Sequence, residues 1–288
     1  MIRSGPDLVH LGPGIGSEAM RNILITGASS GIGRATAKLL AENGYYVFAM
    51  ARRMHRLEEI RSENIEPICL DVTDAPAIEA AINHVMTTQG RIDLLVNNAG
   101  YGQLGAIESV SMEAAHTQFE VNVFGYARFM QAVLPHMRAQ RSGCIINIAS
   151  ILGRISIPGF GWYTASKHAV EALSETLRGE VMEFGIKVIV IAPGLIKTEF
   201  AEKEFALLKT VEHPPVYRKL LDALPRLLKD EPIAPGPEII ARAVLKAAKS
   251  TFPPTRHALP ADSKSAVIGR WFLGGRLFDW AVRRKMKI

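Results

Sequence analysis

Short runs of β-branched and other apolar residues alternate along the chain with longer segments of helical periodicity, beginning at Arg21. The apolar runs predict strands at 22–26, 45–50, 67–70, 94–96, 144–148 and 187–191. The segments between them predict helices at about 31–43, 54–62, 75–89, 112–139 and 163–184. Strands and helices that alternate in this way are typical of βαβ units. We therefore expect an α/β fold, a single doubly wound parallel sheet with helices on both faces, whose ligands bind at the carboxyl ends of the strands.

The alternation stops after Pro193, where a helical segment carries one apolar stripe formed by Val216, Leu220, Leu221, Leu224, Leu227 and Leu228. We interpret residues 199–235 as a helical lid over a substrate site. A further helix is expected at 238–249 and a short last strand within 252–259. The chain then divides into a flexible N-terminal extension at 1–20, one main domain at 21–260 and a C-terminal helical extension at 261–288.

The composition is that of a globular protein. Of 288 residues, 48% are hydrophobic and 22% are charged, which excludes a disordered or coiled-coil chain. Cys69 and Cys144 lie in apolar runs, so we interpret both as small buried hydrophobic residues. The sequence has neither an apolar run long enough for a membrane span nor the pattern of a signal peptide, so a cytoplasmic location is expected.

The net charge of +6 lies entirely in the C-terminal tail, because residues 264–288 hold seven basic residues and one acid. The rest of the chain is formally neutral, which argues against a nucleic-acid partner. In the tail, Trp271, Trp280 and other apolar residues alternate with the basic ones, and Gly274-Gly275 predicts two short helices. The tail could pack as a gate over the substrate cleft or make peripheral contact with a membrane. Our hypothesis is that it does both.

A glycine-rich loop follows the first expected strand and opens the first helix. Such a loop lets the backbone approach a pyrophosphate, which the helix N-terminus then binds. The alternative is a tight strand-to-helix turn, but the strand-loop-helix context favours the phosphate site. The candidate cofactor-binding residues here are Gly27, Ser29, Ser30, Gly31, Ile32, Gly33 and Arg34.

The end of the second strand indicates which dinucleotide binds, since an acid there binds the ribose of NAD and a basic residue accommodates the 2′-phosphate of NADP. The chain has no acid at this point. We expect Arg52, helped by Arg34, to bind that phosphate, although Arg52 and Arg53 could simply be solvated. The residues that follow the third and fourth strands fall where adenine and ribose would lie: Asp71, Val72, Asn98, Ala99 and Gly100.

Four polar residues form the candidate reacting centre. Tyr163 and Lys167 are one helical turn apart, so the ammonium would lower the tyrosine pKa and make Tyr163 a proton donor. Ser150 ends the fifth strand, where its hydroxyl could bind the substrate oxygen. Asn122 lies within an apolar helical segment and needs a partner, either structural or in a proton relay. Each residue alone also has a structural interpretation, as a core aromatic, a surface lysine, a helix cap and a satisfied amide.

Together with the glycine loop, these residues give the chain from 22 to about 200 a pattern that resembles the short-chain dehydrogenase/reductase family. The resemblance implies a Rossmann-type fold and an enzyme that acts on CH–OH groups with NADP. It makes Ser150, Tyr163 and Lys167 a catalytic triad that Asn122 completes as a tetrad, with the tyrosine and lysine also contacting the cofactor. It further implies cofactor contacts from Pro193, Gly194, Ile196 and Thr198, no metal, and a homodimer or homotetramer.

The long apolar segment after Pro193 and the C-terminal extension resemble the 17-beta-hydroxysteroid, retinol and acyl-dihydroxyacetone-phosphate dehydrogenase or reductase subgroup. The expected substrate is therefore an apolar ketone, aldehyde or alcohol such as a steroid, retinoid or acyl lipid. Two alternatives remain. A small-ketone or 3-ketoacyl reductase would need a shorter lid, and a non-catalytic NADP sensor would be expected to lack Tyr163 or Lys167, both of which are present.

Overall fold

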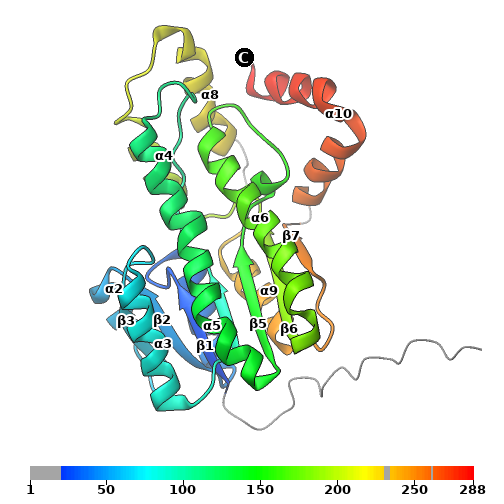
Figure 1. Ribbon diagram of the computed structural model, residues 1–288. Helices are drawn as coiled ribbons and strands as arrows, with labels where there is room; N and C mark the ends of the chain where they lie inside the picture. The colour runs from blue at the N-terminus through cyan, green and yellow to red at the C-terminus, as the bar shows by residue number, and fades with distance from the viewer. Residues whose placement is uncertain (1–20, 230–233, 261) are drawn as a thin grey trace, which may run out of the picture.

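The computed structural model describes residues 21–229, 234–260 and 262–288. Its centre is a sheet of seven strands in the order β3-β2-β1-β4-β5-β6-β7, and every pairing is parallel (Figure 1). The strands are β1 Asn22–Thr26, β2 Tyr46–Ala51, β3 Ile65–Cys69, β4 Leu94–Asn97, β5 Gly143–Ile148, β6 Ile186–Pro193 and β7 Arg256–Leu259. The predicted doubly wound fold is confirmed, and its topological switch point lies between β1 and β4.

Helices cover both faces of the sheet because its strands are apolar on both faces. Along β1, Ile23 and Ile25 pack into one core and Leu24 packs into the other. One face is covered by α1 (Gly31–Glu42), α2 (Met54–Glu58) and α9 (Glu238–Lys249). The other is covered by α3 (Ala75–Gln89), α5 (Gly125–Gln140) and α6 (Gly161–Val181), as Figure 1 shows. A 3₁₀ turn, Met182–Phe184, follows α6.

The helix expected at 112–139 is interrupted. It consists of α4 (Met112–Phe119), a π-helical turn at Glu120–Phe124, and α5. The Ser111 hydroxyl caps α4 by accepting a hydrogen bond from the Ala114 amide at 3.1 Å. Single π turns inside α-helices often occur at functional sites, and this one contains Asn122.

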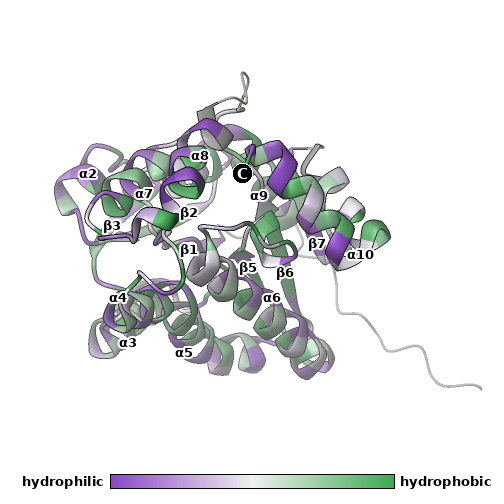
Figure 2. Cartoon of the chain, turned by 90° about the horizontal axis from the view of Figure 1, so that it is seen from above, coloured by the Kyte–Doolittle hydropathy of each residue, from purple (hydrophilic) through white to green (hydrophobic). Residues whose placement is uncertain are grey.

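Three further helices lie above the carboxyl ends of the strands. Seen from above, α7 (Phe200–Leu208) and α8 (Arg218–Lys229) lie on one side and α10 (Asp262–Met286) on another (Figure 2). They share a third apolar core with Phe160 and Tyr163, to which Leu224, Phe278 and Met286 contribute buried side chains. The lid expected at 199–235 stays a prediction, and residues 230–233 of it lie outside the described residues. The domain boundaries proposed from the sequence remain predictions.

Some details differ from the sequence expectations. Val216 is 80% exposed, because it belongs to a 3₁₀ turn, Pro215–Tyr217, that precedes α8 rather than to the apolar stripe of the helix. Cys144 is buried as expected, but Cys69 is exposed, since it is the last residue of an edge strand. The backbone of α10 breaks at Gly274 (φ 66°), which gives the two helical halves that the glycine pair predicts. The extension at 1–20 lies outside the described residues.

Candidate active site

A large cavity of about 1440 Å³ lies between the carboxyl ends of the strands and the helices above them. It runs from the glycine loop, past Ser150 and Tyr163, to the inner face of α10. Nearly all the candidate site residues line this cavity. The exceptions are Gly33, Arg34 and Asn122, which are not among the lining residues.

The glycine loop has the backbone shape that a phosphate-binding turn needs. Gly27 and Gly31 have φ angles of 68° and 52°, in the region that favours glycine. A β-carbon on Gly33 would lie 2.5 Å from the Gly27 carbonyl oxygen, so this glycine lets α1 pack closely against the loop. The Ser30 side chain makes no capping hydrogen bond to α1, and the free N–H groups of such a helix N-terminus suit an anion.

The loop after β4 is tied to the end of β1. The Asn98 side chain donates to the Thr26 and Gly27 carbonyl oxygens at 3.0 and 3.3 Å. In return, the Thr26 hydroxyl accepts hydrogen bonds from the Asn98 and Ala99 amides at 2.9 and 3.0 Å. These contacts hold Asn98, Ala99 and Gly100 at the switch point, where they line the cavity.

Three arginines lie near the loop in different environments. Arg52 lines the cavity with its side chain 74% exposed and only a 3.5 Å contact to Asp71. Arg53, which also lines the cavity, donates to both the Ser29 and Ser30 hydroxyls at 2.9 Å. Arg34 instead pairs with Glu59 at 2.7 Å. Arg52 and Arg53 therefore both line the cavity, whereas Arg34 does not, and its expected help to Arg52 stays a prediction.

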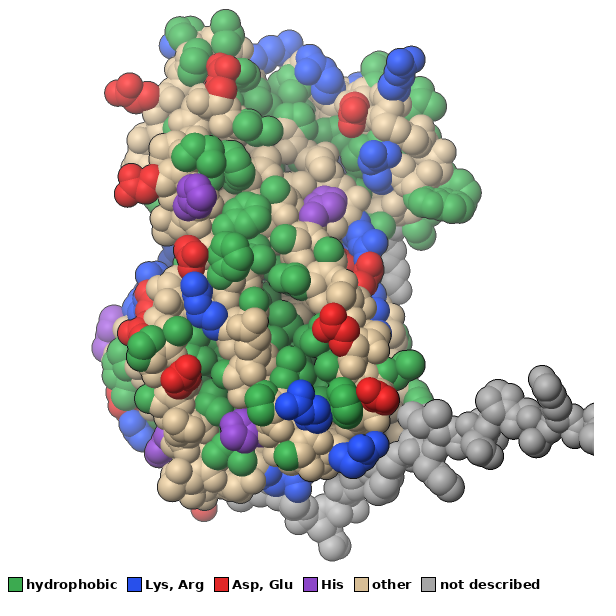
Figure 3. Space-filling view, in the orientation of Figure 1, with side chains coloured by type: hydrophobic (Ala, Val, Ile, Leu, Met, Phe, Trp, Pro, Cys, Tyr) green, Lys and Arg blue, Asp and Glu red, His purple; other side chains and the backbone are tan. Residues whose placement is uncertain are grey.

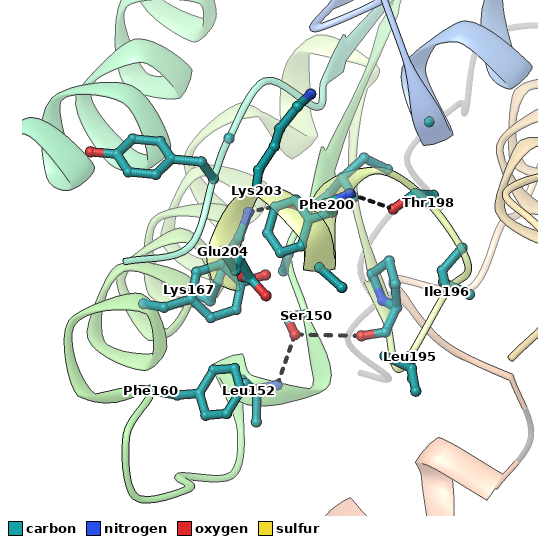
Figure 4. A pocket seen from close by; sticks show the side chains of 18 of the residues that line it. Ser150, Leu152, Phe160, Lys167, Leu195, Ile196, Thr198, Phe200, Lys203 and Glu204 are labelled. Atoms are coloured by element: carbon teal, nitrogen blue, oxygen red, sulfur yellow. Dashed lines mark hydrogen bonds between the residues drawn. The ribbon is translucent and has the colours of Figure 1, made fainter. Parts of the chain in front are cut away.

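The reacting centre combines β5 with the start of α6, as Figure 4 shows. Ser150 follows β5; its hydroxyl oxygen accepts from the Leu152 amide at 3.1 Å, and its side chain is hydrogen-bonded to Tyr163. Lys167 donates from Nζ to the Ile148 carbonyl oxygen at 2.9 Å, and Nζ lies 5.9 Å from the centre of the Tyr163 ring. All three side chains are buried and line the cavity, so the structure brings the expected triad together.

The protonation states differ from the expectation. Burial raises the pKa of Tyr163 above its ordinary value, the charge of Glu204 raises it further, and the hydrogen bond from Ser150 lowers it. Burial also lowers the pKa of Lys167 to about 7, so this lysine is a weaker source of positive charge than a solvated one. The expectation that Lys167 lowers the pKa of Tyr163 is therefore wrong, because the pKa of Tyr163 is raised and Lys167 is not among the groups that shift it. The neutral phenol is the form that donates a proton.

Asn122 is fully buried and lies on the π turn. Its amide group donates to the Tyr101 carbonyl oxygen at 2.9 Å and to the Ser166 hydroxyl at 3.1 Å, and it accepts from the Tyr101 amide at 3.1 Å. These bonds fix the loop after β4 against α6. Asn122 is therefore a buried amide with hydrogen-bond partners, which was its structural interpretation. Its part in a proton relay stays a prediction.

The segment after β6 closes the cofactor side of the cavity. Pro193, Gly194, Ile196 and Thr198 all line it. The Thr198 hydroxyl accepts a hydrogen bond from the Phe200 amide at 3.3 Å, just before α7 begins. Its methyl carbon would lie 3.3 Å from a β-carbon on Gly31, so this segment lies directly against the glycine loop.

Sequence reasoning missed Glu204, a buried acid of α7 that also lines the cavity. Its neighbours Glu202 and Lys203 are exposed, so the helix turns one charged residue inward. One sign of this acid was present in the sequence: Glu204 lies one helical turn after Phe200, in a segment that is otherwise largely apolar. Among the described residues, no group of three or more His, Cys, Asp or Glu side chains is placed so that it could hold a metal ion.

This fold and site define a dinucleotide-dependent oxidoreductase. The family model described as short chain dehydrogenase matches residues 21–208, and the chain belongs to that family. It is 39% identical over 237 residues to the 3-ketodihydrosphingosine reductase of Bacteroides thetaiotaomicron, a match that covers 81% of this chain and 86% of the relative.

Two solved structures are also similar. A short-chain dehydrogenase from Streptomyces avermitilis is 35% identical with a TM-score of 0.80, covering 94% of this chain and 96% of that one. The closed form of a serine dehydrogenase complexed with NADP+ is 28% identical with a TM-score of 0.75, covering 84% of this chain and 95% of that one.

Proposed function

We propose that this chain is an NADP(H)-dependent oxidoreductase that interconverts an alcohol with a ketone or aldehyde on an apolar substrate. One observation carries the proposal. Ser150, Tyr163 and Lys167 meet in the middle of a cavity that has the glycine loop at one end and an apolar lid at the other. A cofactor and a substrate that entered from opposite ends would meet at the Tyr163 hydroxyl.

The residues at the glycine end fit a dinucleotide with a 2′-phosphate. The N-terminus of α1 suits the pyrophosphate, and Arg52 and Arg53 lie where β2 ends, with no acid at that point to bind a free ribose hydroxyl. Asp71, Val72, Asn98, Ala99 and Gly100 would border the adenine and ribose. The NADP+ bound to the similar serine dehydrogenase supports this assignment. When bound, the nicotinamide gives or accepts the hydride.

The chain's own residues would manage the oxygen and its proton. Ser150, which the Leu152 amide orients, would hold the substrate oxygen by a hydrogen bond as charge develops on it. Tyr163 would donate the proton in reduction and accept it in oxidation. Lys167, held by the Ile148 carbonyl oxygen, would bind the nicotinamide ribose and stabilise the phenolate once it forms. Asn122 would position a water that restores the proton.

The other end of the cavity suits an apolar substrate. Its walls include Phe160 and the side chains Ile155, Ile157, Leu207, Leu273 and Phe278. A steroid, a retinoid or an acyl lipid would bury apolar surface there, as expected for the 17-beta-hydroxysteroid, retinol and acyl-dihydroxyacetone-phosphate subgroup. The similarity to a 3-ketodihydrosphingosine reductase favours the acyl lipid among these. A small ketone would leave most of this wall uncovered, which disfavours the small-ketone alternative.

A substrate panel tests the proposal. NADPH oxidation is measured with long-chain ketones, steroids, retinals and small ketones, at equal concentrations. We expect turnover with apolar ketones or aldehydes that exceeds turnover with small ketones by at least tenfold in kcat/KM. If no carbonyl compound is turned over although NADPH binds tightly, the alternative of a non-catalytic NADP sensor would be favoured.

We also propose that α10 makes peripheral contact with an anionic membrane while its inner face closes the cavity. Phe278 and Met286 are buried and line the cavity, whereas Trp271 and Phe272 are 79% and 74% exposed. Figure 3 shows hydrophobic, Lys and Arg side chains gathered over this helix. Exposed tryptophan beside basic residues suits the interface of an anionic bilayer. No helix among the described residues is long and apolar enough to cross a membrane.

Self-association as a dimer or tetramer stays a prediction from the family resemblance.

A further inference from the structure

The Glu204 carboxyl group is a buried acid that the proposed chemistry does not use. The side chain is 4% exposed, and its Oε1 atom is buried without a hydrogen-bond partner. Buried carboxyl groups are costly unless they are paired or hydrogen-bonded. A group of this kind that lines a substrate cavity therefore points to a partner that arrives with the ligand.

The charged neighbours of Glu204 are engaged elsewhere. Lys203 pairs with Glu199 at 3.2 Å, and Lys167 donates to the Ile148 carbonyl oxygen. No ion pair within 4.0 Å joins Glu204 to any other described residue. The carboxyl group is thus available to a cation that comes from outside the chain.

The backbone makes room for this carboxyl group. A β-carbon on Gly102 would lie 1.8 Å from Oε1 of Glu204, so only glycine at 102 lets the side chain occupy its position. Figure 4 shows the carboxyl group pointing from α7 into the pocket, on the side of Ser150 and Lys167. Glu204 lines the same cavity as Ser150 and Tyr163.

We propose that Glu204 binds a protonated amine of the substrate, and hence that the substrates are amphiphilic amino ketones and the matching amino alcohols. The amine would lie near the reacting carbonyl, and the alkyl chain would lie along Ile155, Phe160 and Phe278. This inference rests on the proposed function and narrows its substrate class. The names of two of the three similar proteins fit this class, since 3-ketodihydrosphingosine and serine each carry an amine next to the oxygenated carbon.

The same pairing would also set the charge of Glu204. Burial raises the pKa of this carboxyl group well above its ordinary value, which favours its neutral form. A substrate ammonium beside it favours the carboxylate, so the ion pair would form together with the bound substrate. A ketone without an amine would leave the carboxyl group unpaired in the closed site, which disfavours its binding.

The test compares two ketones and two variants. The ketones are 3-ketodihydrosphingosine and its analogue without the amine, and the variants are Glu204→Gln and the exposed control Glu202→Gln on the same helix. We expect wild type to prefer the amino ketone by tenfold or more in kcat/KM. Glu204→Gln should lower that value about tenfold to a hundredfold for the amino ketone, as for a lost charge-assisted hydrogen bond, and should not lower it to this extent for the other ketone. Glu202→Gln should behave as wild type.

The outcomes separate the two proposals. If wild type reduces neither ketone nor any other carbonyl compound, the proposed function fails. If it reduces both ketones equally and Glu204→Gln changes both equally, the amine site is wrong and the proposed function stands. If Glu204→Gln fails to fold or to bind NADPH, the amine site is tested instead by comparing inhibition of the wild type by dodecylamine and by dodecanol. The amine must then be the stronger competitive inhibitor by at least tenfold, and equal inhibition would overturn the proposal.

Discussion

At the scale of single residues, the site depends on burial more than on pairs of opposite charges. Tyr163 and Lys167 are both buried, and burial shifts each pKa towards the neutral form, to about 7 for the lysine. In its neutral form, neither group needs a counter-ion. The raised pKa of Tyr163 fits its proposed role as the proton donor in reduction.

Cofactor preference is also decided by individual residues. We predict that wild type prefers NADPH over NADH and that Arg52→Glu lowers kcat/KM for NADPH by at least tenfold, because a charge-assisted contact with the 2′-phosphate is lost and a repulsion is gained. Steady-state kinetics with each cofactor measure this change. The control is Arg242→Glu, the same charge reversal at an exposed position of α9.

That control should leave both cofactors unaffected. Wild-type protein that used NADH as well as NADPH would contradict the role given to Arg52. Loss of NADPH use in Arg53→Ala but not in Arg52→Glu would transfer that role to Arg53, whose guanidinium already binds the hydroxyls of the glycine loop.

At the scale of elements, much of the fold could be predicted from periodicity. The helices expected at 75–89 and 238–249 match α3 and α9, because each has a polar or proline start and a regular apolar stripe. The helix expected at 112–139 hid a π turn, since one extra residue in a turn does not change the apolar pattern enough to be noticed. The only local sign of the π turn was Asn122, a poor helix former among apolar residues.

The site was predictable to the extent that it follows strand ends and helix spacing. Ser150, Tyr163 and Lys167 could be found in this way, because a strand end and one helical turn fix their positions. Glu204 and Arg53 could not. Which side of α7 faces the cavity, and which arginine bends towards the loop, depend on packing between segments far apart in the sequence.

The glycine loop gives a prediction at this scale. Gly33→Ala should unfold at a lower temperature and lose most NADPH affinity, because the new β-carbon would lie 2.5 Å from the Gly27 carbonyl oxygen. Gly179→Ala, inside α6 with no atom within 4 Å of the new β-carbon, is the control and should be stabilising by about 0.5–1 kcal/mol. Thermal unfolding and NADPH fluorescence measure both effects. Equal behaviour of the two variants would contradict a close-packed phosphate turn.

At the scale of the whole molecule, the sheet holds the chemistry and the helices above it decide what reaches it. α10 packs on α8 and contributes both a wall of the cavity and an exposed aromatic face. An apolar substrate that is dissolved in a bilayer could then enter beside this helix. The segments at 200–229 and 262–288 share the third apolar core, so we expect them to move together if they open.

Vesicle sedimentation tests the outer face of the tail. We predict that the wild type binds phosphatidylglycerol vesicles better than phosphatidylcholine vesicles, and less at high salt, because basic side chains are attracted to anionic lipid. Trp271→Ala with Phe272→Ala should reduce binding at least fivefold. The control pair is Met182→Ala with Phe252→Ala, which are 70% and 71% exposed elsewhere on the surface. Equal binding of the wild type and the tail variant would contradict the membrane contact and leave the tail only its role as a gate over the substrate cleft.

The central claim is that Tyr163 donates the proton to the substrate oxygen. The most direct measurement compares Tyr163→Phe with wild type in steady-state turnover and in NADPH binding by fluorescence, with a carbonyl substrate found by the panel. We predict that kcat falls at least about a hundredfold while NADPH affinity changes less than about threefold, since only the proton donor is removed. A variant that kept more than about a tenth of wild-type kcat would contradict the claim.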